Sequence, residues 1–315
     1  MKKDKKMFIF IEAVLGTMVL FLAFLMLREK NVDKSYQISV IVENADDTQW
    51  SAFKYGLKMA AEDKGAEMVM VSTGASLSQE EEKKLIEEEI KNGADGVIVQ
   101  PVSGEDTQQM LKEVGNKAEI MLVDDILSGI EKFPVIQPDA YAIGKTLVEE
   151  LLKDYGGNLE GKHWEILNER RFEKSVAVKK RRDLNRSFAG DRSVKLFWSD
   201  TQITEEYADV DFVIALDDNS LRAAGEMAAA NNLHGAIVYG IGNSTQSVYY
   251  LDMGIAECLV IPDTFNVGYQ SLTELVNKLE KAFYEYENQE ISYTVMRKEN
   301  MFSKENQEVI FTMSQ

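Results

Sequence analysis

The sequence predicts an α/β protein with two lobes, each built on a parallel sheet, behind one apolar N-terminal segment. Three observations support this prediction. The chain has 315 residues, more than one hydrophobic core usually serves. Short apolar runs alternate with amphipathic stretches, as in a repeated strand–helix unit. Runs such as VIVQ and IMLV are apolar at successive positions, which is typical of strands that are covered on both faces.

The first lobe begins after Ser35, where strands and helices alternate in order. The predicted strands are QISVIVE, EMVMVS, GVIVQP and EIMLVD, and the predicted helices cover residues 47–64, 79–92 and 105–114. Trp50 begins the apolar face of the first helix. Ser78 and Glu81 form a capping box before the second helix, and Gly93 ends it.

The pattern restarts after Lys132 and predicts a second lobe. The predicted strands are FPVIQPD, HWEILN, VKLFW, DFVIALDD, GAIVYGIG and AECLVI, with helices over residues 140–154, 175–187, 219–231 and 245–252. A long helix over residues 267–286 follows. From ISYTV onward the chain is expected to form a strand and then irregular structure. No low-complexity linker separates the two lobes.

The N-terminal segment Met7–Leu27 is apolar apart from small polar residues and Glu12, and its length is enough to cross a bilayer as a helix. Its exit lacks the A-x-A pattern of a cleavable signal, and the sole cysteine, Cys258, is too distant to be a lipoprotein's first residue. We therefore expect residues 1–28 to be an uncleaved, single-pass anchor in the cell membrane. The excess of lysines before it predicts a cytoplasmic N-terminus and an extracytoplasmic two-lobe domain.

Charge and motif content exclude several classes of function. Residues 1–28 carry five basic and two acidic side chains, so the total charge of −18 leaves −21 on the rest of the chain. Such a charge disfavours binding to nucleic acid. With two histidines, one cysteine and no Ser/His/Asp pattern, the sequence predicts neither an enzyme nor a metal or other cofactor.

Polar and aromatic side chains follow the predicted strands, at the edge where open parallel sheets bind ligands. The candidates are Asp47, Gln49, Trp50, Asp124, Asp125, Trp198, Asp217 and Asn243. Carboxylates and amides accept hydroxyl hydrogen bonds, and an indole covers the apolar face of a sugar ring. The same groups suit a cationic solute through charge and cation–π contact. A small polar solute is therefore the expected partner.

Several of these residues also have a purely structural explanation. Asp218 is more simply a helix cap than a ligand residue, whereas for Asp217 the two roles are balanced. Periodicity alone places Trp50 in the lobe core. The basic run at residues 179–182 suits a solvated helix face, although one of its arginines can reach the site. The stretch GIGNST lacks the third glycine of a dinucleotide-binding loop.

The motifs, taken in order, resemble type I periplasmic solute-binding proteins of the ribose, galactose and autoinducer-2 group. They are DTQWSAFKYGLKMAAEDKG, NGADGVIVQPVS, EIMLVDD, PDAYAIGKTLVEEL, FVIALDDNSLRAAGEM, GIGNS and IPDTFNVGYQSL. The resemblance implies two Rossmann-like lobes joined by three crossings, near residues 133–139, 259–265 and 288–295. It assigns residues 35–132 plus 266–287 to the N-terminal lobe, and 138–260 plus 291–315 to the C-terminal lobe.

The resemblance also implies roles for residues of the N-terminal lobe. Aromatic residues of the first loop enclose the ligand ring in this family, and the matching positions are Trp50 and Gln49. This resemblance favours a ligand contact for Trp50 over the core. The family's Asp-Arg pair falls on Asp124 and Asp125, so an acid replaces the arginine and ordinary hexose recognition is altered.

In the C-terminal lobe, the family's ligand-binding arginine corresponds to Arg181 or Arg182. The family's acidic or amide pair falls on Asp217 and Asp218. A glycine stands where the family has a loop aspartate, with Asn243 beside it, and Pro262 or Asp263 stands where a glutamine is usual. The family's scaffold is therefore recognisable, while several of its sugar-contacting positions carry other residues. These residues complete the predicted site.

The function that the resemblance implies is hinge closure of two lobes on a small polar ligand, a sugar or a sugar-like molecule, without covalent chemistry. We expect such a protein to present its ligand to an ATP-driven (ABC) importer. The alternative is a ligand-sensing receptor that reports its closed state to a membrane histidine kinase.

Overall fold

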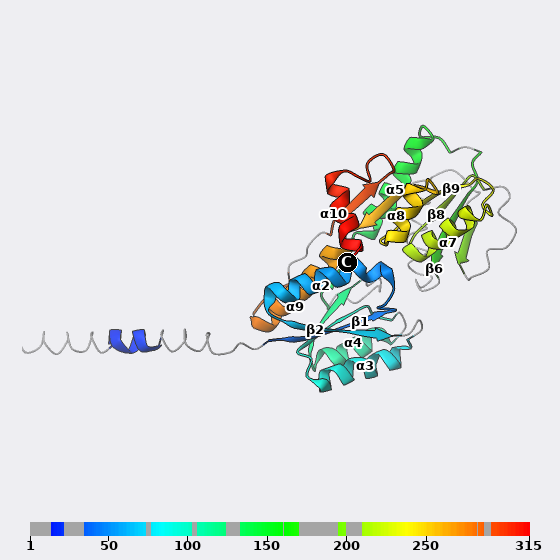
Figure 1. Cartoon of the computed structure of the whole chain (residues 1–315). Coiled ribbons are helices and arrows are strands. Elements are labelled where there is room, and N and C mark those ends of the chain that lie inside the picture. The colour runs from blue at the N-terminus through cyan, green and yellow to red at the C-terminus, as the bar shows by residue number, and fades with distance from the viewer. Residues whose placement is uncertain are drawn as a thin grey trace, which may run out of the picture. The chain divides into compact units, whose positions relative to one another are not determined.

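The computed structural model describes residues 14–21, 35–73, 77–102, 106–123, 133–159, 161–169, 195–199, 210–281, 283–286 and 291–315, with the backbone alone at 165, 168, 169 and 195–199 (Figure 1). The chain divides into two units, Met1–Ser35 and Tyr36–Gln315. Residues 14–21 of the first unit are helical. Among the described residues, none of the helices has both the length and the hydropathy that a bilayer-spanning segment needs. Most of the predicted anchor lies outside the described residues, so the anchor stays a prediction.

The first sheet has five strands in the order β2-β1-β3-β4-β5, and all of its neighbours pair in parallel. Its strands are β1 (Gln37–Glu43), β2 (Glu67–Thr73), β3 (Gly96–Val99), β4 (Glu119–Val123) and β5 (Val135–Ile136). The helices between them are η1 (Thr48–Trp50), α2 (Ser51–Lys64), α3 (Gln79–Asn92) and α4 (Thr107–Gly115). The strands predicted before residue 124 are all present.

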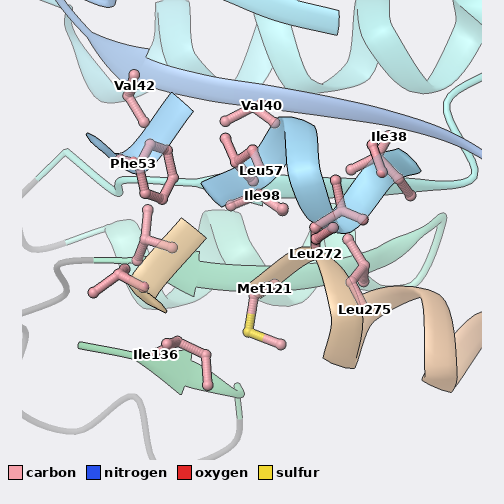
Figure 2. Close-up of a cluster of buried hydrophobic side chains, with 14 of the residues drawn as sticks. Ile38, Val40, Val42, Phe53, Leu57, Ile98, Met121, Ile136, Leu272 and Leu275 are labelled. Atoms are coloured by element: carbon pink, nitrogen blue, oxygen red, sulfur yellow. The ribbon is translucent and has the colours of Figure 1, made fainter. Parts of the chain in front are cut away.

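Helices cover both faces of this sheet. Helix α2 and the later helix α9 (Thr264–Glu280) lie on one face, and α3 and α4 lie on the other (Figure 1). Alternate residues of β1 point to the two faces, so that Val40 joins the cluster under α2 and α9 while Ile41 joins the cluster under α3 and α4. Figure 2 shows Leu57 of α2 and Leu272 of α9 facing strand β1.

Glycines allow α2 and α9 to approach closely. A Cβ atom added at Gly56 would lie 2.0 Å from the carbonyl oxygen of Phe265, and one added at Gly268 would lie 2.2 Å from the carbonyl oxygen of Phe53. No side chain fits at either distance, so each glycine is required by the backbone of the opposite helix. The close contact fixes α9, which is remote in sequence, against the first sheet.

The second sheet has six strands in the order β11-β10-β9-β8-β6-β7, parallel except for the antiparallel pair β10–β11. Its strands are β6 (Trp164–Glu169), β7 (Lys195–Ser199), β8 (Phe212–Ala215), β9 (Ile237–Ile241), β10 (Ala256–Pro262) and β11 (Tyr293–Met296). Helix α5 (Ala140–Asp154) covers one face, and α7 (Asp218–Ala229) and α8 (Thr245–Asp252) cover the other.

Most predicted helices are present with the expected ends. The bounds of α3, α5 and α8 match the prediction, and the capping box of Ser78 and Glu81 forms as predicted. The first helix starts later than predicted because residues 48–50 form a separate 3-10 turn. Helix α9 is displaced towards the N-terminus, since Asp263 caps it. The predicted helix over residues 175–187 lies outside the described residues.

The irregular end predicted for the chain is wrong, because α10 (Lys304–Met313) follows β11 there. Ser303 caps this helix by accepting a hydrogen bond from the backbone N–H of Asn306, and Met313 is buried. An asparagine at the position where a capping box has Glu or Gln weakens the sequence signal.

The three predicted crossings lie side by side. Pro138 forms a parallel bridge with Ile291. The backbone N–H of Asp263 donates to the carbonyl oxygen of Ser292 at 3.0 Å, and the Ser292 hydroxyl donates to the Asp263 carboxylate at 3.1 Å. The segments near residues 138, 263 and 291 therefore contact each other where the chain passes between the sheets. The lobe boundaries given above stay a prediction.

Candidate functional site

The loop after β1 carries the first group of predicted site residues. Asp47 caps the turn η1, where its carboxylate accepts from the backbone N–H of Gln49 at 3.3 Å. Trp50 ends the same turn and is only 9% exposed. Its indole N–H donates to the carbonyl oxygen of Glu43 at 3.0 Å, and its ring meets Phe53 edge-on with centroids 5.3 Å apart. Trp50 thus lies in the lobe core, as periodicity alone indicates, and its contact with a ligand stays a prediction.

A buried carboxylate lies behind the ends of β1 and β3. Glu82 of α3 is 1% exposed, and its two oxygens accept from the backbone N–H of Val102 at 3.0 and 3.2 Å. Burial, followed by the nearby charge of Glu43, raises the pKa of Glu82 to about 7, against the hydrogen bond from Val102. Gln100 links the same strand ends, because its side-chain oxygen accepts from the backbone N–H of Glu43 at 3.4 Å.

The sequence interpretation missed Glu82, because it lies in the acid-rich stretch QEEEKK, which is typical of a solvated helix face. The available signal is its spacing from Ile86, which is fully buried four residues later on the same helix face.

Two adjacent aspartates follow β8, and the prediction that Asp218 is the helix cap is wrong. Asp217, rather than Asp218, caps α7 by accepting from the backbone N–H of Ser220 at 2.8 Å and from its hydroxyl at 2.9 Å. Asp218 is 4% exposed and holds the loop after β9. One of its oxygens accepts from the backbone N–H of Asn243 at 3.0 Å, from the Ser244 hydroxyl at 2.8 Å and from the Ser247 hydroxyl.

Asn243 joins the strand ends of the two sheets. Its side-chain N–H donates to the backbone carbonyl of Gln49 at 3.2 Å, across 194 positions of sequence. The side-chain oxygen of Asn243 and the second oxygen, Oδ2, of Asp218 are both buried without a hydrogen-bond partner among the residues that the structure describes. Unpaired buried acceptors are costly, so a solute or water that brings donors would be favoured there.

A second contact to the loop after β1 pairs Asp47 with Arg222 of helix α7, whose guanidinium nitrogen lies 3.4 Å from the carboxylate. Three predicted residues, namely Asp47, Gln49 and Asn243, are therefore brought together. Arg222 is a fourth member that the sequence interpretation missed. It lies four residues after Asp218 and so on the same face of α7, which is the signal that could have found it.

The remaining predicted residues are not brought to this point within the part of the chain that the structure describes. Asp124, Asp125, Arg181 and Arg182 lie outside the described residues, and so does the side chain of Trp198 in β7. Asp263 caps α9 through the backbone N–H of Asn266 at 3.0 Å and lies in the crossing region. Ligand contacts by these residues stay predictions.

Neither a metal-binding cluster nor a reactive thiol is present in the described ranges. Those ranges contain no group of three or more His, Cys, Asp or Glu side chains that could hold a metal ion. Cys258 is fully buried in β10, and burial raises the pKa of its thiol to about 12. A thiol with this pKa stays protonated at neutral pH and is a poor nucleophile. Cys258 is therefore a core residue.

A family comparison bears directly on this arrangement. Residues 38–181 match the family model described as a periplasmic binding protein domain. The resemblance to periplasmic solute-binding proteins is confirmed. The match covers the whole first sheet, from β1 to β5, and continues through α5 and β6. A comparison with curated proteins gives no match.

Solved structures share the two-sheet fold. A carbohydrate transporter solute-binding protein from Agrobacterium radiobacter, in complex with D-arabinose, superposes with a TM-score of 0.75 at 16% identity, over 89% of this chain and 100% of that one. GanP, a glucose-galactose binding protein from Geobacillus stearothermophilus, gives 0.71 at 14%, over 86% and 100%. A chain of the XylFII–LytSN complex gives 0.68 at 13%, over 84% and 98%. At these identities the likeness concerns the fold.

Proposed function

We propose that this protein is a membrane-anchored, extracytoplasmic solute-binding protein that closes its two lobes on a small polar ligand, a sugar or a sugar-like molecule. The observation that carries the proposal is the meeting of strand-end loops from both sheets at Gln49 and Asn243. Ligands of open parallel sheets bind at such strand ends. The D-arabinose complex of a protein with the same fold supports a sugar as the ligand class.

The chemistry of the described residues favours a ligand rich in hydrogen-bond donors. The unpaired side-chain oxygens of Asp218 and Asn243 can only accept hydrogen bonds in their present state. Sugar hydroxyls or an ammonium group would satisfy them, whereas an acidic solute would add negative charge beside a buried carboxylate. Asp124 and Asp125, if they reach the same site, make it still less suited to an acid.

In this proposal the anchor keeps the domain at the membrane surface, where an ABC importer would accept the closed, liganded form. The alternative function is a ligand-sensing receptor whose closed state is read by a membrane histidine kinase. One observation supports the alternative: a solved structure with the same fold is that of a XylFII–LytSN complex, so a protein of this fold can bind a partner.

A thermal-shift screen of the full chain in detergent tests the ligand class. Sugars, polyols, amino sugars, polyamines and acidic solutes are added singly, and we expect one of the hydroxyl-rich or cationic classes to raise the melting temperature. Stabilisation follows from mass action, since a ligand that binds only the folded state adds about 2.7 kcal/mol at a hundredfold excess over its Kd.

Asn243→Ala should reduce that shift, while Asn232→Ala, at an exposed position beyond α7, serves as the control. Stabilisation by acidic solutes alone would contradict the proposal. Two assays then distinguish the importer role from the receptor role. Cells that lack this protein are compared with parent cells for uptake of the radiolabelled ligand and for ligand-dependent phosphorylation of membrane kinases. Loss of uptake supports the importer role, and loss of phosphorylation with normal uptake supports the receptor role.

A further inference from the structure

The loops that carry the predicted ligand residues contact each other directly in the structure. Arg222 lies 3.4 Å from the carboxylate of Asp47, with side chains that are 37% and 20% exposed. Asn243 donates to the carbonyl oxygen of Gln49 at 3.2 Å. Both contacts run from the second sheet's loops and helices to the β1–α2 loop of the first sheet. Groups expected to receive a solute are therefore engaged with one another.

Apolar contacts between helix α2 and the second lobe accompany the two polar contacts. Ala52, in the first turn of α2, is 2% exposed and belongs to the core cluster of the second sheet, against which Phe265 also packs. Tyr55 of α2 meets Phe311 of α10 edge-on, with centroids 6.1 Å apart. The start of α2 is thus docked on the second lobe at several points, and the β1–α2 loop is held where Arg222 and Asn243 can reach it.

The Asn243 side of this contact is rigidly supported. Asp218 is buried and accepts from the backbone N–H of Asn243 and from two serine hydroxyls, which fixes the loop after β9 relative to α7. Because Arg222 extends from the same helix, its guanidinium and the amide of Asn243 form one unit. That unit presents two donors to the β1–α2 loop.

We propose that Arg222 and Asn243 form a latch that holds the two lobes together without ligand, and that a solute binds by competing with Arg222 for Asp47. The latch gives Asp47 a partner whenever no solute occupies the site, which reduces the cost of bringing a carboxylate under the second lobe. It is also incomplete, because the side-chain oxygen of Asn243 remains without a partner in the described residues. A solute that offers a donor there can exchange for the latch contacts.

The latch biases the equilibrium between open and closed lobes without locking it. Solvent-exposed ion pairs contribute about 0.2–1 kcal/mol. Loss of the pair should therefore change the ratio of open to closed molecules by a factor of about 1.4 to 5. A solute needs only a modest excess of affinity for the closed state to dominate such a bias. Salt should weaken the bias, since a partly exposed pair is screened at high ionic strength.

Distances between spin labels in the full, detergent-solubilised chain, with no solute added, measure the latch directly. Labels are placed through Glu88→Cys on α3 and Glu226→Cys on α7, two exposed positions on different lobes. Cys258 is buried, so it should stay unlabelled, and the parent chain's label stoichiometry checks this. At low salt we expect Arg222→Gln and Asp47→Asn each to raise the ratio of long-distance to short-distance populations about two- to fivefold.

The charge-swapped pair Asp47→Arg with Arg222→Asp should restore the parent distribution, and 1 M salt should remove the difference between Arg222→Gln and parent. Lys145→Gln is the control for removal of a surface cation, because it breaks a more exposed ion pair with Glu149 that lies on α5 alone. Identical distributions for parent and Arg222→Gln at low salt would overturn the latch, and so would an open population that the swap fails to reverse.

Circular dichroism melting confirms that each variant is folded. If Arg222→Gln does not fold, Asp47→Asn and a salt series on the parent chain replace it. In both, a rise in the long-distance population supports the latch and an unchanged distribution overturns it. The competition between solute and Arg222 rests on the solute-binding function proposed above, whereas the latch itself is measured independently, because no ligand is added. A thermal-shift screen without hits would leave the latch standing, and the absence of a latch would leave solute binding standing.

Discussion

Among the described residues, Glu82 is an acid whose protonation bears directly on stability. Its pKa is raised from 4.5 to about 7 in the folded protein, so between these pH values the folded state keeps a proton that the unfolded chain releases. The stability from this group is fully present below about pH 4.5 and is lost as the pH rises through about 7. The raised pKa corresponds to a loss of about 3 kcal/mol across that window.

Glu82→Gln should therefore remove the decline, leaving the variant more stable than the parent at pH 8 and no more stable at pH 4.5. Urea unfolding of the full chain at several pH values measures the free energy of unfolding for both. Glu88→Gln, at an exposed site on the same helix, is the matched control and should keep the parent's profile. Parallel profiles for Glu82→Gln and parent would mean that the carboxylate is charged at neutral pH.

At the same scale, sequence reasoning singled out Asp217 and Asp218 but assigned the helix cap to Asp218, whereas Asp217 is the cap. Either aspartate can cap a helix that follows β8. The capping residue depends on where the helix begins, and apolar periodicity defines that first residue only to within one or two positions. Helix α7 begins at Asp218, so Asp217 becomes the cap and Asp218 turns inward. The partner of Asp47 is also a property of packing between lobes, which local sequence patterns do not encode.

Among the elements, helices α2 and α9 depend most strictly on particular residues. Gly56→Ala and Gly268→Ala would each place a Cβ atom within 2.0–2.2 Å of a backbone oxygen of the opposite helix. Overpacking of this kind typically costs about 1–3 kcal/mol, and it outweighs the gain of about 1 kcal/mol in helix propensity. We expect both variants to melt at lower temperature than the parent.

Gly144→Ala provides the matched control, because it lies inside α5 and an added Cβ atom there would meet nothing within 4 Å. Its expected effect is a gain of about 0.5–1 kcal/mol from propensity alone. Thermal melts of the three variants, read by circular dichroism, distinguish the cases. An unchanged melting temperature for Gly56→Ala and Gly268→Ala would show that the two helices can separate at no cost.

The elements also show where sequence patterns succeed and fail. Strands β1, β3 and β4 were predictable because continuous apolar runs have few alternatives in an α/β lobe whose sheet is covered by helices on both faces. Helix α3 was predictable to the residue, since both of its ends carry specific caps at Ser78 and Gly93. Helix α10 was not, because its start has no capping box and its burial depends on contacts with α2 and α8.

At the scale of the whole molecule, the sequence supported the two-sheet architecture and the order of the crossings. The alternation of strands and helices restarts once, and Asp263 and Ser292 meet as crossing segments of one region should. The antiparallel β10–β11 pair and the precise partners of each crossing required the folded chain. Four of the eleven predicted site residues lie outside the described residues, and so does the side chain of Trp198, so their place in the site stays a prediction.

The attachment of the chain to the membrane is the remaining whole-molecule prediction, and it rests on Met7–Leu27. Apart from Glu12 the segment is apolar over a bilayer's thickness, and an acid near the end of a span costs little because it can reach the interface. Without an A-x-A exit or a nearby cysteine, no cleavage is expected. The full chain should therefore stay in the membrane fraction after carbonate extraction, with its N-terminus intact.

Deletion of residues 1–34 should release the two-lobe domain into the soluble fraction, whereas substitution of the lysines before the span by glutamine should leave attachment intact and disturb orientation. Protease added to spheroplasts reads the orientation, since only an extracytoplasmic domain is digested. N-terminal sequencing of the chain isolated from cells decides between an anchor and a signal peptide. A sequence beginning beyond Leu27 would mean that the segment is removed, and the solute-binding domain would then work without a tether of its own.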